Sequence, residues 1–119
     1  MGDIRLAETE RRFVELVWQK EPLGSGELVA LCEKELNWKK STTYTVLRRL
    51  CQKGILENED AIVTSLIKKE EYMARCSEQV VEDTFSGSLP QFVAAFMSRK
   101  KLSRKQIEEI QKLIDDYKS

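Results

Sequence analysis

Residues 38–54, with the sequence WKKSTTYTVLRRLCQKG, are the ones whose side chains could do specific chemistry. This stretch holds five basic residues and no acid, in a chain whose 20 basic and 20 acidic residues balance to zero net charge. Arginine can pair with guanine, threonine can offer a hydroxyl or a methyl group, and lysine can neutralise phosphate. The stretch therefore favours contact with the major groove of DNA.

The spacing of apolar residues in this stretch predicts one short helix. Ser41 is a good N-cap residue, and Gly54 is expected just past the C-terminal end. Val46, Leu47 and Leu50 recur at three- and four-residue intervals and are expected to face a core. The residues left to face outward are polar or lie at the border of the apolar stripe: Thr42, Thr45, Arg48, Arg49 and Gln52, with Tyr44 at the edge.

The flanking segments predict a scaffold for this helix. Helices are expected at 7–20 and 25–36, with Ser25 as the cap of the second and Pro22-Leu23-Gly24 as a turn or short extended piece between them. Beyond Gly54, two β-prone runs flank the polar Asn58-Glu59-Asp60 and predict a short hairpin. Three helices followed by a hairpin make the winged form of the helix-turn-helix motif, so the predicted fold is mainly α with a small antiparallel β wing.

The remaining residues return to helical spacing. Helices are predicted at 68–85, at 89–100 after a cap at Ser88, and beyond Ser103, which forms a capping box with Gln106. An ordinary intramolecular core is one possibility, but three amphipathic helices are thin for a core of their own, which favours packing against a second copy of the chain. The residues expected at this dimer contact are Tyr72, Cys76, Val80, Phe85, Leu89, Phe92, Phe96, Ile107, Ile110 and Ile114.

The composition argues against several classes of protein. Histidine is absent, so the usual zinc ligand and the usual general base are both missing, and no metal site, cofactor or enzyme activity is expected. The three cysteines, Cys32, Cys51 and Cys76, lie within apolar helical patterns, which favours buried thiols over a redox switch. Without a signal peptide or a long apolar run, a cytoplasmic location without membrane insertion is expected.

A second basic cluster follows the penultimate predicted helix. It consists of Arg99, Lys100, Lys101, Arg104 and Lys105. A solvated turn is the favoured interpretation, and extra phosphate contacts are the alternative.

Several of these segments together resemble the penicillinase-repressor family, the BlaI/MecI/CopY-type bacterial transcriptional regulators. LAETERRFVELVWQKEPLGSGELV resembles the family's first two helices, and FSGSLPQFVAAFMSRKKLSRKQIEEIQKLI resembles its dimerisation helices. The segment STTYTVLRRLCQKGIL matches the family's Thr-x-x-Thr-x-x-x-Arg-Leu-x-x-Lys-Gly run at Thr42, Thr45, Arg49, Leu50, Lys53 and Gly54.

The resemblance implies a homodimeric repressor of palindromic operator DNA. It implies a winged-helix DNA-binding domain at 1–68, a helical dimerisation domain at 69–119 and a reading helix at about 41–53. Arg49, beside the apolar stripe, is expected either to contact DNA or to brace the fold. The residues expected at DNA are Lys39, Lys40, Ser41, Thr42, Tyr44, Thr45, Arg48 and Arg49.

The chain departs from the family pattern at two places. Glu57, Glu59 and Asp60 put acids around the wing tip, where phosphate would repel them, and no cysteine follows Cys76, which argues against copper sensing. Zero net charge and the acidic wing leave a second interpretation open, a winged-helix protein-interaction module that does not read DNA.

Antibiotic-responsive members of the family are inactivated by cleavage that a membrane sensor protease triggers. The corresponding bond here would join Ala95 and Phe96. The alternative is that Phe96 is simply a core residue.

Overall fold

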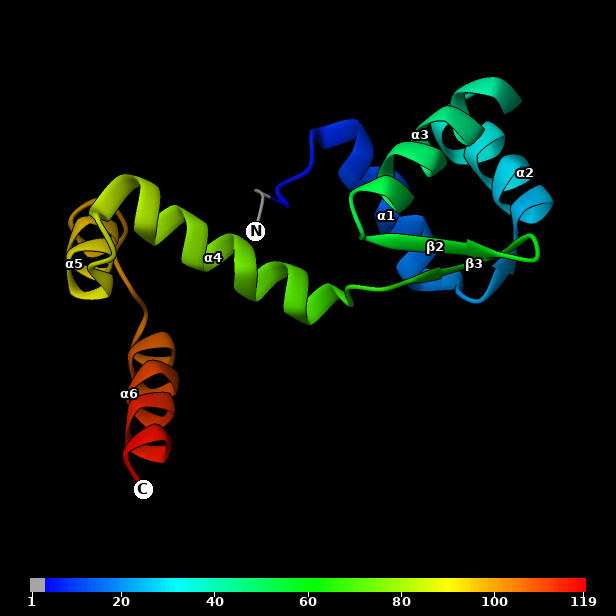
Figure 1. Cartoon of the computed structure of the whole chain (residues 1–119). Coiled ribbons are helices and arrows are strands. Elements are labelled where there is room, and N and C mark those ends of the chain that lie inside the picture. The colour runs from blue at the N-terminus through cyan, green and yellow to red at the C-terminus, as the bar shows by residue number, and fades with distance from the viewer. Residues whose placement is uncertain (1–3) are drawn as a thin grey trace. The chain divides into compact units, whose positions relative to one another are not determined.

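A computed structural model describes residues 4–119, and within this range it contains six helices and a three-stranded sheet (Figure 1). In chain order the elements are α1 (Glu8–Lys20), β1 (Leu23–Gly24), α2 (Ser25–Leu36), α3 (Lys40–Gln52), β2 (Leu56–Glu59), β3 (Ile62–Ser65), α4 (Lys69–Phe85), α5 (Leu89–Arg99) and α6 (Arg104–Lys118). The predicted fold, mainly α with a small antiparallel wing, is confirmed. The chain forms two compact units, one up to Gln79 and one over Val80–Ser119, so the division falls inside α4.

The sheet of the first unit is antiparallel, with strand order β1-β3-β2. Glu59 pairs with Ile62, so the hairpin turn consists of Asp60 and Ala61, which both have positive φ (52° and 61°). Two successive positive φ angles are typical of the type I′ turn, whose twist suits a two-residue hairpin. The turn therefore lies later than the expected Asn58-Glu59-Asp60, and the segment expected to be a turn or extended piece supplies the third strand.

The core of the first unit joins all three N-terminal helices to the sheet. Val46, Leu47 and Leu50 of α3 are buried as predicted. They pack with side chains from α1, α2, the sheet and the start of α4: Phe13, Val14, Val17, Leu28, Cys32, Ile55, Leu56, Val63, Ile67 and Tyr72. Because the inner face of α3 is held by this core, the outer face of α3 has a fixed direction.

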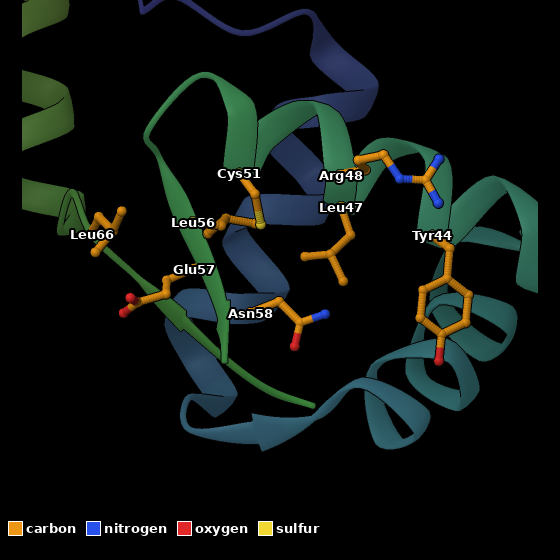
Figure 2. A pocket seen from close by; sticks show the side chains of 8 residues that line it. All are labelled: Tyr44, Leu47, Arg48, Cys51, Leu56, Glu57, Asn58 and Leu66. Carbon is orange, nitrogen blue, oxygen red and sulfur yellow. The ribbon is translucent and has the colours of Figure 1, made fainter. Parts of the chain in front are cut away.

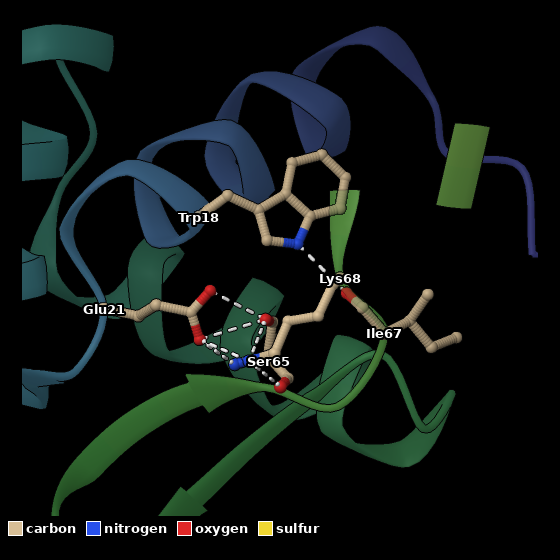
Figure 3. A network of polar contacts seen from close by, with 5 residues as sticks. All are labelled: Trp18, Glu21, Ser65, Ile67 and Lys68. Carbon is tan, nitrogen blue, oxygen red and sulfur yellow. Dashed lines mark hydrogen bonds and ion pairs between the residues drawn. The ribbon is translucent and has the colours of Figure 1, made fainter. Parts of the chain in front are cut away.

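A polar network fixes the base of the wing to the end of α1 (Figure 3). The Glu21 carboxylate accepts hydrogen bonds from Ser65 N (2.8 Å), from Ser65 Oγ and from Lys68 Nζ (3.1 Å). Trp18 Nε1 donates to the carbonyl oxygen of Ile67 at 3.0 Å. Desolvation raises the pKa of Glu21, but the hydrogen bonds from Ser65 and Lys68 outweigh it, so this pKa lies below the ordinary 4.5. The charged form of Glu21 therefore stabilises the position of the wing.

The second unit has caps where the sequence predicts them but few buried side chains. Ser88 Oγ accepts from Gln91 N, and Ser103 and Gln106 form the expected capping box. Phe92 contacts both Phe85 and Phe96, with ring centroids 5.6 and 6.3 Å apart. Every residue of α6 is exposed. The amphipathic faces of α5 and α6 therefore have little to cover them within the described chain.

Two residues expected at the dimer contact belong instead to the first unit. Tyr72 is only 4% exposed, since its hydroxyl accepts from Leu6 N (3.1 Å) and its ring lies against Trp18 (5.5 Å between centroids). Cys76 is partly buried against the same core. Both side chains pack against residues of their own chain and are therefore not available for a dimer contact.

Candidate nucleic-acid interface

The N-cap of helix α3 lies two residues before Ser41, the N-cap that the sequence predicts. Its N-cap is Lys39, with extended backbone angles (φ −73°, ψ 156°), and Ser41 is already inside the helix. The ring of Trp38 stacks on Phe13 at 5.5 Å, which anchors the chain just before the helix starts. Tertiary packing therefore sets this terminus, and no side-chain cap is needed.

The C-terminal end of α3 follows the prediction. Gly54 has φ 79°, and its N–H donates to Cys51 O (3.0 Å) while Ile55 N donates to Leu50 O (3.0 Å). These two bonds form a Schellman motif, whose left-handed residue is usually glycine. The motif turns the chain directly from α3 into the wing.

Burial divides α3 into an inner and an outer face. The inner face carries Thr43 in addition to the three predicted residues. At 100° per residue, four exposed residues lie most nearly opposite this face: Ser41, Thr45, Arg48 and Gln52. Lys39, Lys40, Thr42 and Arg49 are also exposed, and Tyr44 is half-buried at the border. The structure thus brings the predicted DNA-binding residues together on one helix surface.

A groove separates α3 from the wing (Figure 2). Its volume is about 490 Å³, and Leu47 and Leu56 lie in its middle. Tyr44 and Arg48 extend toward one side of the groove and Glu57 toward the other. The Tyr44 hydroxyl lies 3.4 Å from Ser25 Oγ, at the start of α2. Arg48 therefore stands at the rim, free of an ion-pair partner among residues 4–119.

The opposite flank of α3 contacts α1 through ion pairs. Glu10 Oε2 lies 3.4 Å from Arg49 Nε, and Glu10 Oε1 lies 3.8 Å from Lys53 Nζ. Sequence reasoning did not single out Glu10. The available signal was an acid three residues after Ala7, the position from which a side chain can cap a helix start.

The wing carries negative charge on its exposed surface. Glu57, Glu59 and Asp60 are all exposed, and no basic residue lies between Lys53 and Lys68. A phosphate near this hairpin would therefore be repelled.

The remaining chemistry of the described residues is limited. Burial raises the pKa of the Cys32 and Cys51 thiols, which keeps both protonated and unreactive. Within residues 4–119, no group of three or more potential ligands is placed to hold a metal ion. In the same range, no helix is long and apolar enough to cross a membrane.

Known proteins are similar to this chain over nearly its whole length. The chain is 23% identical to the penicillinase repressor of Bacillus licheniformis over 119 residues, which covers 97% of this chain and 93% of that protein. It is 25% identical over 113 residues to an uncharacterized 16.5 kDa protein of the ptsI 3′ region in Latilactobacillus sakei, covering 92% of this chain and 77% of that protein.

A solved structure is similar to part of this chain. The solution structure of monomeric B. licheniformis BlaI in complex with the blaP half-operator matches with a TM-score of 0.51 and 25% identity, over 60% of this chain and 94% of that one. The sequence profile of the penicillinase repressor family matches residues 6–116. The chain therefore belongs to the penicillinase repressor family.

Proposed function

We propose that this protein is a homodimeric transcriptional repressor that binds palindromic operator DNA through α3. The observation that carries the proposal is the exposed, acid-free outer face of α3, which stands on a buried core. The BlaI structure that is similar to 60% of this chain is a complex with half-operator DNA. The protein would act in the cytoplasm, without a cofactor and without catalysis.

The dimensions of α3 suit the major groove. Its 13 residues span about 20 Å, and a groove about 12 Å wide admits one helix. Ser41, Thr42, Thr45 and Arg48 would face base edges or adjacent phosphates, and Tyr44 would contact the backbone beside the groove. Lys39 and Lys40, at the helix start, would neutralise phosphates.

The second part of the proposal is a dimer built from the C-terminal helices. Ile107, Ile110 and Ile114 of α6 are 52%, 43% and 48% exposed. The contact would also use α5 and the end of α4, through Val80, Phe85, Leu89, Phe92 and Phe96. Burying large apolar side chains gains about 2 kcal/mol each, against the entropic cost of association. The expected boundary between the DNA-binding and dimerisation domains, 68/69, moves into α4 after Gln79, because Tyr72 and Cys76 pack in the first unit.

The dimer would determine which DNA is bound. Two reading helices related by a two-fold axis require two half-sites in palindromic order, one or two helical turns apart. Bound at a promoter, the dimer would block polymerase.

Release of the operator could follow cleavage between Ala95 and Phe96, triggered by a membrane sensor protease. Both residues are exposed, which supports access, but both lie inside α5, so the helix would have to unwind locally before cleavage. The proposal predicts shortened chains in the native host after inducer treatment. Chains that stay intact while the regulated genes are induced would contradict it.

The acidic wing supports a second candidate, a winged-helix module that binds proteins and not DNA. A gel shift with promoter DNA from the host separates the two functions. A repressor should shift promoter fragments, with an affinity that falls steeply as salt rises. A protein-interaction module should shift none at any salt concentration.

A further inference from the structure

Glu10 lies at the junction between the start of α1 and the reading helix. It is 8% exposed, although it is a charged residue near the N-terminus of a helix. Its Oε1 accepts a hydrogen bond from Ala7 N at 3.1 Å, which completes the capping box of α1. The same carboxylate pairs with Arg49 at 3.4 Å and with Lys53 at 3.8 Å. One buried anion therefore serves two cations of α3.

The two cations form one flank of α3. Arg49 and Lys53 are four residues apart, so their side chains lie about one turn apart on the same side of the helix. Arg48 is rotated by 100° from Arg49 and stands at the groove beside the wing (Figure 2). Neighbouring arginines in the sequence thus have different surroundings: Arg49 pairs with Glu10, whereas Arg48 has no ion-pair partner among residues 4–119.

Burial of Glu10 makes the pairing persistent. A carboxylate removed from water needs its counter-charges, and breaking such a pair leaves an uncompensated buried charge. The side chains of Arg49 and Lys53 are 51% and 39% exposed, so they could reach a phosphate, but such a move would leave the Glu10 carboxylate without its counter-charges. Staying with Glu10 is therefore favoured over moving to DNA.

We propose that Glu10 is an internal counter-ion for Arg49 and Lys53 and thereby limits how many DNA phosphates α3 can neutralise. This inference rests on the DNA-binding function proposed above. Random DNA is bound through phosphate charge, whereas an operator is also read by base contacts. Lowering the positive charge of the flank that carries Arg49 and Lys53 weakens binding to random DNA and does not change Arg48. Glu10 thus raises the ratio of operator binding to random binding, which decides occupancy in a genome.

The proposal predicts how steeply DNA affinity should depend on salt, because the positive charges available to phosphate can be counted. The bases of residues 38–53 without an ion-pair partner among the described residues are Lys39, Lys40 and Arg48. Each neutralised phosphate contributes about 0.9 to the slope of log affinity against log salt. One carboxylate balances one of the two cations of this flank, so the paired state gives a slope of about 3.6 per subunit, whereas five unbalanced bases would give about 4.5.

The test measures binding of the full chain to a random-sequence duplex and to promoter DNA by fluorescence anisotropy, between 50 and 200 mM KCl. Glu10→Gln keeps an amide oxygen that can cap α1 but removes the charge. Its slope on random DNA should steepen by about 0.9 per subunit, so the affinity falls about 3.5-fold further per bound subunit across this four-fold salt range than for the wild type. The ratio of operator binding to random binding should fall.

A matched control lies one turn further along the same helix. Glu15 pairs with Lys69 at 2.6 Å and with Arg11 at 4.0 Å, and among residues 4–119 it forms no ion pair with a base of α3. Glu15→Gln removes the same charge from α1 and should leave the slope within about 0.3 of the wild-type value. A general effect of net charge would instead move both variants alike.

A second arm removes both cations of the flank. Arg49→Gln together with Lys53→Gln in the wild-type chain should lower the slope by only about 0.9 per subunit, because Glu10 already balances one of these two charges. The same two substitutions beside Glu10→Gln should lower the slope by about 1.8. A decrease of about 1.8 in the wild-type background would overturn the proposal.

The outcomes separate this inference from the proposed function. A wild-type chain that binds DNA with a steep slope, together with a Glu10→Gln slope that is equal or shallower, overturns the role of Glu10 alone. A shallower slope would mean that Glu10 presents Arg49 to a phosphate. A wild-type chain that binds no DNA at any salt concentration overturns the proposed function and this inference with it.

Discussion

Replacing Arg48 with alanine should separate base reading from phosphate binding at the centre of the candidate interface. Arg48 is exposed at the rim of the groove, it has no ion-pair partner among residues 4–119, and it faces away from the core. The substitution should therefore leave the free energy of unfolding within about 0.5 kcal/mol of the wild-type value. Any large effect on DNA binding would then come from the contact itself.

The expected loss depends on what Arg48 contacts. A bidentate contact with a base is worth about 1–3 kcal/mol, so operator affinity should fall roughly 5- to 150-fold while binding to random DNA changes much less. A phosphate contact would instead weaken binding to every sequence, and the salt slope would fall by about 0.9. We expect the first pattern, because Arg48 lies near the middle of the outer face.

Fluorescence anisotropy with operator and random duplexes distinguishes these patterns. Arg12→Ala is the matched control, because Arg12 is an exposed arginine of the same unit on α1, away from the outer face of α3. It should leave both affinities nearly unchanged. Operator affinity that is also unchanged in Arg48→Ala would remove this residue from the reading surface and refute the assignment of the outer face.

Three further predictions concern the scaffold, the wing and the dimer. Leu50→Ala should lower the free energy of unfolding, measured in urea, by about 2–5 kcal/mol, because Leu50 is fully buried. Gln52→Ala, on the exposed side of α3, should change this free energy little. Equal effects of the two substitutions would contradict the burial of the inner face of α3. The folded-state pKa of Glu21 is depressed, so the stability that its charged form contributes is present above pH 4.5 and is lost as pH falls below this value. Glu21→Gln should therefore flatten the dependence of the melting temperature on pH below pH 4.5. If this dependence is the same as in the wild type, the network of Glu21, Ser65 and Lys68 does not stabilise the fold. Ile110→Glu should sediment as a monomer at micromolar concentration with unchanged helix content, whereas the control Glu109→Gln should stay dimeric. A dimeric Ile110→Glu variant would exclude α6 from the dimer contact.

The periodicity of apolar residues predicted most elements because it reports which side of a helix is buried. The end of α3 at Gly54 and the caps at Ser88 and Ser103 also followed from sequence, since each depends on residues within one or two turns. These features are local. Local patterns predict them because no distant residue is needed to satisfy them.

The features that sequence reasoning missed depend on distant contacts. Spacing alone placed Tyr72 at a dimer contact, yet its hydroxyl accepts from Leu6, 66 residues away. The start of α3 is set by the stacking of Trp38 on Phe13, so Ser41 is not needed as a cap. Periodicity shows that a side chain is covered but not what covers it.

The same limit applies to charge within the candidate site. Residues 38–53 hold five bases and no acid, and the sequence left open whether Arg49 contacts DNA or braces the fold. The structure divides them, since Arg49 and Lys53 face Glu10. Within the part of the chain that the structure describes, Lys39, Lys40 and Arg48 have no ion-pair partner. An acid 39 residues before Arg49 thus alters the surface that DNA would meet, and no pattern within α3 reveals it.

The central claim is that α3 reads operator DNA as part of a two-fold dimer. The most direct test selects fragments of the host genome with the full chain and then footprints the enriched fragments with hydroxyl radicals at two salt concentrations. The account predicts two protected half-sites in palindromic order, one or two helical turns apart, whose protection is lost as salt rises. A selection that enriches no fragment, or a single protected site without two-fold symmetry, would contradict it.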